Sequence, residues 1–262
     1  MALMSENGTA LHRENFEEFY IRWKEKQNLH LHDLITTATE PSSSSSLPGL
    51  VDRVISHYEE YYRVKSKCIK TDVLLILSAP WKTALEDAFN WVGGWRPSAA
   101  FHLLYSKSGL QLESKLSEQM KGVGMVDLGD LSSAQLSLMD KLQRITIQRE
   151  REISEKVAKR QERVADQEMV ELSHHVSELA RTQGRQSDNS EMARAVASTL
   201  THKEEDFQMV VQSADNLRLK TLKGIVDILS PIQAVHFLIA AAELNLSIHD
   251  WGKVKEEMKT GS

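Results

Sequence analysis

The stretch SAPWKTALEDAFNWVGGWRPS, residues 78–98, holds three of the chain's five tryptophans in a helix, turn, helix pattern. Pro80 ends one helix and can begin the next, because proline lacks the N–H group that a helix interior needs. Gly93 and Gly94 follow where the end of a helix favours the left-handed conformation. Pro97 then stands where the first turn of a helix tolerates proline. The stretch therefore predicts a tight corner between helices.

The large aromatic side chains of this corner predict a packing hub, which we define as Trp81, Phe89, Trp91 and Trp95. Each buried aromatic ring of this size removes about 150 to 250 Å² of surface from water. Truncation of such a ring in a core costs about 3 to 5 kcal/mol of stability, which is the loss expected for Trp91→Ala. The corner is therefore expected to be a folding centre and not an active site.

The composition of the 262 residues, 41% hydrophobic and 26% charged, is that of a globular protein with one large domain or two modest ones. A net charge of −5 argues against phosphate neutralisation as the main source of affinity, so we expect no direct binding of nucleic acid. The single cysteine, Cys68, excludes an internal disulfide and suits the nucleus or the cytoplasm. No signal peptide or membrane span is expected, because Glu243 and Asn245 interrupt the most apolar run.

Apolar residues recur at spacings of three and four along the chain, and there are only five prolines. This spacing predicts an all-α, multi-helix bundle with no sheet. We expect a flexible N-terminus over 1–13 and one helical domain over 14–258, with a linker at 40–48 and a loop region at 107–131. Expected helices cover 14–39, 50–77, 97–105, 191–229, 231–244 and 248–258.

One long charged helix is expected at about 132–181. An apolar stripe runs through this segment, while 12 of the 21 residues in 148–168 are charged. A continuous helix of this length would measure about 75 Å. A compact domain of this size has a radius of gyration of about 18 Å. The helix must therefore protrude, bend or break.

Four segments together resemble the plant Delay of Germination (DOG) domain, which is shared with the C-terminal half of the TGA-type bZIP transcription factors. The tryptophan and Gly-Gly stretch is the most specific of them. The others are FEEFYIRWKEKQNLHLHDL (16–34), SADNLRLKTLKGIVDIL (213–229) and PIQAVHFLIAAAELNLSIHDWG (231–252). The resemblance covers nearly the whole chain.

The resemblance implies a non-enzymatic plant regulator of seed dormancy, germination or maturation, linked to abscisic acid signalling and to transcription regulation. It also implies action through protein partners, either type 2C protein phosphatases or transcription regulators. No basic region or zipper precedes the domain, so a bZIP fork on DNA is not expected. A DNA-associated transcription regulator like the TGA factors is one alternative function.

A sensor of haem or of another small ligand, such as an apolar acid, is the second alternative. The resemblance implies haem-binding histidines near the C-terminal Trp-Gly, where this chain offers His249 and has Asn245 one turn earlier. His236 could supply a second imidazole if folding brought the two together. The residues predict no catalytic group, no metal site and no cofactor other than this possible haem.

Overall fold

A computed structural model describes residues 3–39, 46–118, 127–182 and 189–260. Within these ranges the regular structure is helical, apart from an isolated bridge between Trp91 and Gly94. The all-α fold predicted from the apolar spacing is therefore confirmed.

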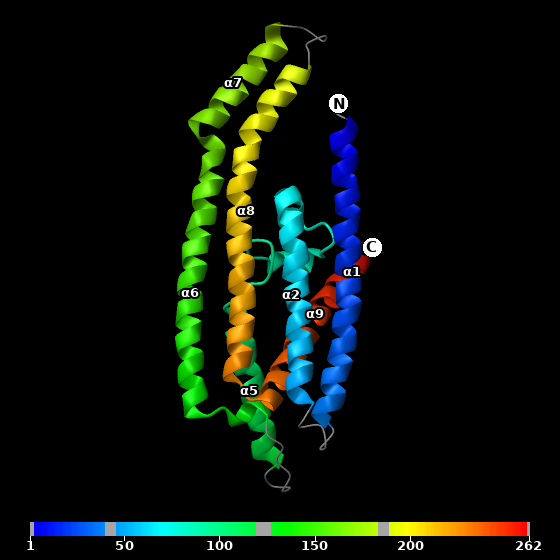
Figure 1. Ribbon diagram of the computed structural model, residues 1–262, viewed down its shortest axis with the longest axis vertical. Coiled ribbons are helices and arrows are strands. Elements are labelled where there is room, and N and C mark those ends of the chain that lie inside the picture. The colour runs from blue at the N-terminus through cyan, green and yellow to red at the C-terminus, as the bar shows by residue number, and fades with distance from the viewer. Residues whose placement is uncertain (1–2, 40–45, 119–126, 183–188, 261–262) are drawn as a thin grey trace.

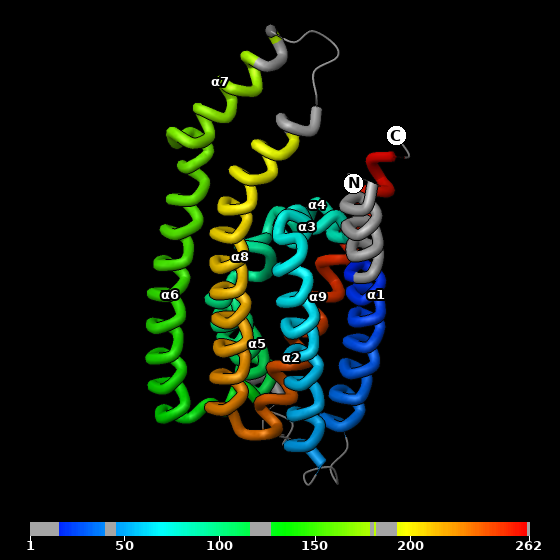
Figure 2. The backbone as a smooth tube through the Cα atoms, turned by 45° about the horizontal axis from the view of Figure 1, so that its top comes forward, coloured from blue at the N-terminus to red at the C-terminus, as the bar shows by residue number. Residues whose placement is uncertain are grey.

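Four long helices lie side by side in the order α6, α8, α2 and α1 (Figure 1). Helix α9 crosses behind α1 and α2 and packs against both, and α5 packs against α9. The long helices are α1 (Leu3–Thr39), α2 (Leu47–Thr71), α5 (Ala99–Glu118), α6 (Ser133–Glu162), α8 (Asn189–Ile228) and α9 (Pro231–Thr260). The short elements are α3 (Val73–Ser78), α4 (Ala84–Ala88), the turn η1 (Leu128–Asp130), the turn η2 (Arg163–Ala165) and α7 (Gln167–Thr182). Figure 2 shows α3 and α4 at the C-terminal end of α2.

The main core lies where α1, α2, α5, α8 and α9 meet. Helices α2 and α9 contribute equally to it, and the apolar run of α9 is buried over consecutive turns. Fully buried members of this core include Leu34, Val54, Phe101, Leu104, Ile225, Val235 and Phe237. Helix α9 is also long enough and apolar enough to cross a membrane by length and composition alone. Its apolar side is instead packed inside this core, as in the central helix of a bundle.

The first helix begins earlier than the sequence predicts. It starts at Leu3, whereas the expected start was residue 14 after a flexible segment over 1–13. Most of the expected linker at 40–48 lies outside the described residues, and α2 already begins at Leu47. Helix α5 runs to Glu118, so the first part of the expected loop region at 107–131 is helical.

Aspartates break two of the expected long helices. Asp72 leaves the helical conformation, with φ −151° and ψ 88°, and its side chain caps α3 by accepting from the N–H of Leu75 at 2.8 Å. The helix expected over 50–77 is therefore two helices. Asp166 accepts from the N–H of Met169 at 3.2 Å and begins α7, so the helix expected over 132–181 breaks at this point. Aspartate favours such positions because its carboxylate satisfies an unpaired N–H.

The opposite correction applies to the C-terminal part of the chain. The two helices expected at 231–244 and 248–258 form the single helix α9. Asn245 and Ser247 have only a weak preference against helix, which is not enough to interrupt α9.

Candidate functional site

The carboxylate of Glu86 joins three helices at the start of α4. Thr83 and Glu86 form a capping box, in which each side chain accepts a hydrogen bond from the other's backbone N–H. Oε2 of Glu86 also lies 2.8 Å from Nδ1 of His249 in α9. Oε1 accepts hydrogen bonds from Tyr20 and Lys24 in α1, at 3.2 and 3.3 Å.

The electrostatics of this corner keep Glu86 ionised. Burial alone would raise the pKa of its carboxyl group, but the hydrogen bonds from Thr83 and His249 and the charge of Lys24 lower it to about 2. Helix α9 comes this close because position 252 is a glycine, where any Cβ would overlap Thr83. The corner therefore fixes α1, α4 and α9 relative to one another.

The chain turns sharply between Trp91 and Trp95, and we call this segment the tryptophan turn. Two cations and one carboxylate are buried behind it. Lys65 of α2 donates to Oδ1 of Asp215 at 2.7 Å and to the carbonyl oxygen of Gly93 at 2.8 Å. Arg218, one turn after Asp215 in α8, donates to the same oxygen at 2.6 Å. All three charged side chains are almost completely buried. A buried charge is costly unless it is paired and hydrogen-bonded, so this arrangement strongly constrains the turn.

Arg218 fixes the backbone of the turn directly. Its Nε donates to the carbonyl oxygen of Trp95 at 2.6 Å, and its Nη2 donates to those of Trp91 and Val92. Gly94 leaves room for the guanidinium group, since a Cβ there would lie 2.9 Å from the guanidinium carbon. Val92 has φ +47°, which a β-branched residue rarely adopts. The hydrogen bonds from Arg218 hold this strained conformation in place.

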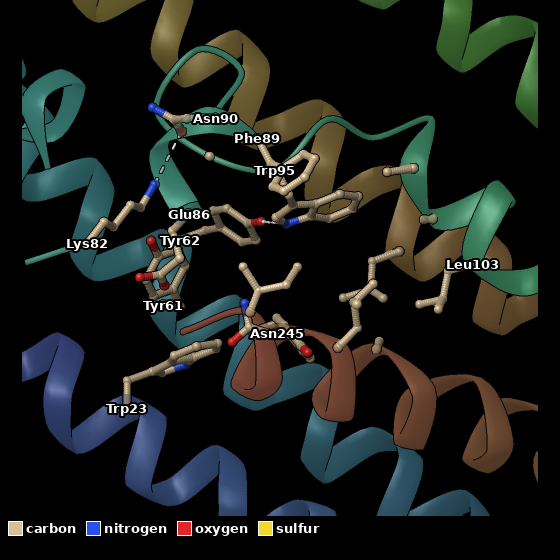
Figure 3. A pocket seen from close by; sticks show the side chains of 18 of the residues that line it. Trp23, Tyr61, Tyr62, Lys82, Glu86, Phe89, Asn90, Trp95, Leu103 and Asn245 are labelled. Carbon is tan, nitrogen blue, oxygen red and sulfur yellow. Dashed lines mark hydrogen bonds between the residues drawn. The ribbon is translucent and has the colours of Figure 1, made fainter. Parts of the chain in front are cut away.

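A cavity of about 220 Å³ lies between the tryptophan turn, α2, α5 and α9 (Figure 3). Its lining is mostly aromatic and aliphatic, and includes Tyr62, Trp95, Leu103, Phe237, Leu244 and Ile248. Sites for drug-sized ligands measure about 300 to 1,000 Å³. This cavity therefore suits a small and largely apolar molecule.

Polar groups lie at one end of the cavity. Figure 3 shows Lys82 and Asn90 on the side away from Leu103. Nζ of Lys82 donates to Oδ1 of Asn90 at 3.2 Å. In the wall between the two ends, the indole N–H of Trp95 donates to the hydroxyl of Tyr62 at 2.9 Å. A few placed polar groups in an apolar lining are typical of a ligand site.

The residues predicted as a packing hub lie in different surroundings. The three tryptophans pack against three separate hydrophobic clusters: Trp81 contacts the cluster around Phe16 and Ile76, Trp91 the cluster around Ile153 and Val210, and Trp95 the main core. The indole N–H of Trp91 also donates to Oγ of Ser154 in α6 at 3.0 Å. Phe89 is different: it is 68% exposed and lies at the cavity edge, so its assignment to the hub was wrong.

The two candidate haem ligands are not brought together. His236 and His249 lie thirteen residues apart on the continuous helix α9, which places them about 20 Å apart along its axis. Nδ1 of His249 contacts Glu86, and Nδ1 of His236 lies 3.4 Å from the amide nitrogen of Gln111. Neither histidine lines the cavity, which is also smaller than a site for a ligand of haem's size. The residues therefore do not fit a haem held by this pair.

Sequence reasoning missed the residues that organise the site. Lys65, Asp215 and Arg218 are charged residues on amphipathic helices, and such residues usually lie at the surface. The spacing of three between Asp215 and Arg218 was the one local signal, because it places both on the same helix face. The pairing with Lys65 joins residues far apart in the sequence and leaves no local pattern.

Comparison with known proteins shows which family the sequence resembles. Residues 30–106 match the DOG1 family model, described as seed dormancy control. Protein DOG1-like 3 of Arabidopsis thaliana is 29% identical over 251 residues, covering 92% of this chain and 85% of the relative. Protein DOG1-like 4 of the same plant is 30% identical over 243 residues, covering 91% and 92%. Transcription factor TGA2 is 30% identical over 236 residues, covering 90% of this chain and 61% of TGA2.

The helical fold and the matched segment define a plant DOG-type domain. The chain belongs to the DOG1-like family, since its likeness to DOG1-like 4 extends over almost the full length of both proteins. The TGA factors share the same domain over part of their length.

Proposed function

We propose that this chain is a non-enzymatic regulator of seed dormancy, germination or maturation that acts by binding other proteins. The family description and the names of its relatives support a role in dormancy and in transcription. We place its action in abscisic acid signalling, with type 2C protein phosphatases or transcription regulators as partners. The compartment would be the nucleus, the cytoplasm or both.

The arm formed by α6, η2, α7 and α8 is the observation that best supports protein binding. Figure 1 shows α7 and the adjoining end of α8 reaching past the end of α2. Along the arm, Lys156 and Lys159 of α6 are exposed, and so are the apolar residues Val164 and Val170, which are 70% and 58% exposed. We take these exposed charged and apolar side chains as the groups that a protein partner would contact.

Calorimetric titration of the full chain with a purified type 2C protein phosphatase tests this proposal. The pair Lys156→Glu and Lys159→Glu is expected to weaken binding about tenfold or more, because it reverses two charges on the arm. The matched control is Lys253→Glu with Lys255→Glu, which makes the same change in charge on exposed residues of α9. Absence of binding to both a phosphatase and a TGA-type factor would contradict the proposal.

A second role, as a sensor of a small apolar ligand, is favoured by the cavity. Its aromatic lining and its polar end at Lys82 match the general form of a ligand site. Quenching of tryptophan fluorescence by a small apolar molecule, followed in wild type and in Leu103→Trp, tests this role. The larger side chain is expected to fill the cavity and remove the quenching, and an unchanged titration would count against the cavity.

Direct DNA binding is not part of the proposal. The chain carries a net charge of −5, and phosphate contacts dominate the affinity of proteins that bind DNA on their own. A mobility-shift assay at physiological salt is therefore expected to show no complex unless a DNA-binding partner is added.

A further inference from the structure

Lys82 is the cation at the polar end of the cavity, and it has an unusual set of contacts. It lies between α3 and α4, where its backbone N–H donates to the carbonyl oxygen of Ala79 at 2.9 Å. Its Nζ donates to the neutral amide oxygen of Asn90 at 3.2 Å. Within the described part of the chain, no carboxylate forms an ion pair with Nζ. A partly buried cation facing an apolar cavity would normally have such a partner.

Two other lysines with reduced access to solvent provide the contrast. Lys65 is bound to Asp215 at 2.7 Å and is 1% exposed, so no ligand can reach it. Lys24 is paired with Glu86 at 3.3 Å. Lys82 differs from both because it lines the cavity and its partner is neutral. It is therefore the lysine of this group that a bound molecule can approach.

The orientation of Asn90 is fixed from its other side. Its amide nitrogen lies 3.4 Å from Oδ1 of Asp87, and its backbone N–H donates to the carbonyl oxygen of Asp87 at 2.9 Å. The amide oxygen consequently faces Lys82. Asn90 can accept a hydrogen bond from Nζ whether the nitrogen is charged or neutral, so it does not force the ammonium form.

The burial of Lys82 also favours the free amine. Burial, together with the charge of the nearby Arg218, lowers the pKa of Lys82 to about 8, although Glu86, Asp87 and Asp215 oppose this shift. An ordinary lysine has a pKa near 10.4. At pH 7.5 the fraction present as free amine is therefore about 200-fold larger than for an ordinary lysine.

We propose that Lys82 is a nucleophilic lysine that forms a reversible imine with a small apolar aldehyde bound in the cavity. The proposal rests on the ligand-binding role of the cavity and is independent of protein binding by the arm. An apolar tail would lie along Trp95 and Leu103, and the carbonyl carbon would lie at the polar end. Lysines with these properties, placed in a hydrophobic pocket, are those that attack carbonyl groups.

The chemistry requires nothing beyond the amine and the aldehyde. The lone pair of neutral Nζ forms a bond to the carbonyl carbon, the C=O π electrons move to oxygen, and a proton passes from nitrogen to oxygen. The carbinolamine then loses its hydroxyl group with a second proton as water, while the nitrogen lone pair forms the C=N bond. No atom is oxidised or reduced. The apolar lining disfavours the water that would reverse the reaction, and Asn90 can accept a hydrogen bond from the protonated imine.

Reductive trapping tests the proposal on the full chain. Hexanal is added at pH 7.5 with cyanoborohydride, and peptide mass spectrometry locates each hexyl group. We expect the modification of Lys82 to exceed that of the exposed lysines Lys253 and Lys255 at least tenfold. Lys82→Arg should remove this product and leave modification of the exposed lysines unchanged, while Lys253→Arg should leave modification of Lys82 unchanged. Thermal melting of both variants confirms that they are folded.

Competition separates this inference from the ligand-binding role itself. Hexanol, which cannot form an imine, should quench tryptophan fluorescence and protect Lys82 from hexanal. If Lys82 and the exposed lysines are modified to the same extent, the proposal for Lys82 is overturned. If hexanol quenches in wild type but Lys82 is not preferred, the cavity binds ligands without imine chemistry. Hexanoate, the corresponding carboxylate, is a second probe that cannot form an imine. If neither hexanol nor hexanoate binds, the ligand-binding role fails as well.

Discussion

Thr83 and Gly252 are in such close contact that a Cβ placed on Gly252 would lie 2.6 Å from Cβ of Thr83. The helix α9 therefore rests directly on the capping box that begins α4. His249 lies three residues before Gly252 on α9. The contact therefore also sets the position of His249 opposite Glu86.

Gly252→Ala should consequently displace α9 from this corner. A methyl group cannot be accommodated without movement of the backbone, since Cβ of Thr83 is fixed directly to the backbone at the start of α4. We expect a loss of about 1 to 3 kcal/mol in the free energy of unfolding, measured by urea denaturation. Gly109→Ala is the matched control: it lies within α5 with open space around it, and it should be neutral or slightly stabilising.

Arg218→Met should destabilise the protein by about 3 to 5 kcal/mol. The substitution keeps much of the side-chain length but leaves the carbonyl oxygens of Trp91, Val92 and Trp95 without their buried donor. Arg144→Met, on the exposed face of α6, removes only a surface ion pair and should change stability by less than about 0.5 kcal/mol. Equal stability of the two variants would show that Arg218 does not hold the turn.

Trp91→Ala should lower the stability of the protein much more than Phe89→Ala, although both remove an aromatic ring from the same corner. Trp91 packs against α6 and α8 and lies 5.3 Å from the guanidinium of Arg218, so its truncation should cost about 3 kcal/mol. Phe89 is 68% exposed, and its truncation should cost less than about 0.5 kcal/mol. Thermal unfolding of the two variants measures the difference.

Acidification should destabilise the contact between α1 and α2. His57 is buried, stacked on Trp23 with ring centroids 4.7 Å apart, and burial together with the charges of His30 and Lys26 lowers its pKa to about 3. Between the unfolded pKa of 6.5 and this value the unfolded chain binds the proton more readily than the folded one. The contribution of His57 to stability is therefore fully present above pH 6.5, and it is lost progressively as the pH drops from 6.5 towards 3.

The variant His57→Phe isolates this contribution to the pH dependence. Phenylalanine can keep the stacking on Trp23 but cannot take up a proton. The slope of unfolding free energy against pH between 6.5 and 3 should become shallower in the variant than in wild type. A slope that is the same in both proteins would assign acid sensitivity to other groups.

Local sequence patterns were sufficient for the helical class and for the turn at Gly93, which has φ +76° and so needs glycine. They failed at Asp72, and they allowed for a break in the long charged helix without placing it at Asp166. In both cases a capping carboxylate was a readable signal inside an otherwise periodic run. They failed in the opposite sense at Asn245, where weak local signals suggested a break but α9 continues without interruption.

The candidate site was less accessible to sequence reasoning than the fold. The aromatic residues of the cavity were visible as a group, and Trp95 does line it. Lys82 carried no signal, because one lysine in a charged chain is ordinary and its importance comes from the missing carboxylate partner. The cluster of Lys65, Asp215 and Arg218 joins elements 150 residues apart, so only the folded chain reveals it.

The close approach of Gly94 to Arg218 makes these two positions an evolutionary unit. Any side chain at 94 must expel the guanidinium group, and loss of the guanidinium group removes the need for glycine at 94. Relatives that retain arginine at the position of Arg218 should therefore retain glycine at that of Gly94, whereas relatives without this arginine need not. A side chain at position 94 is thus expected only in relatives that have already lost the arginine.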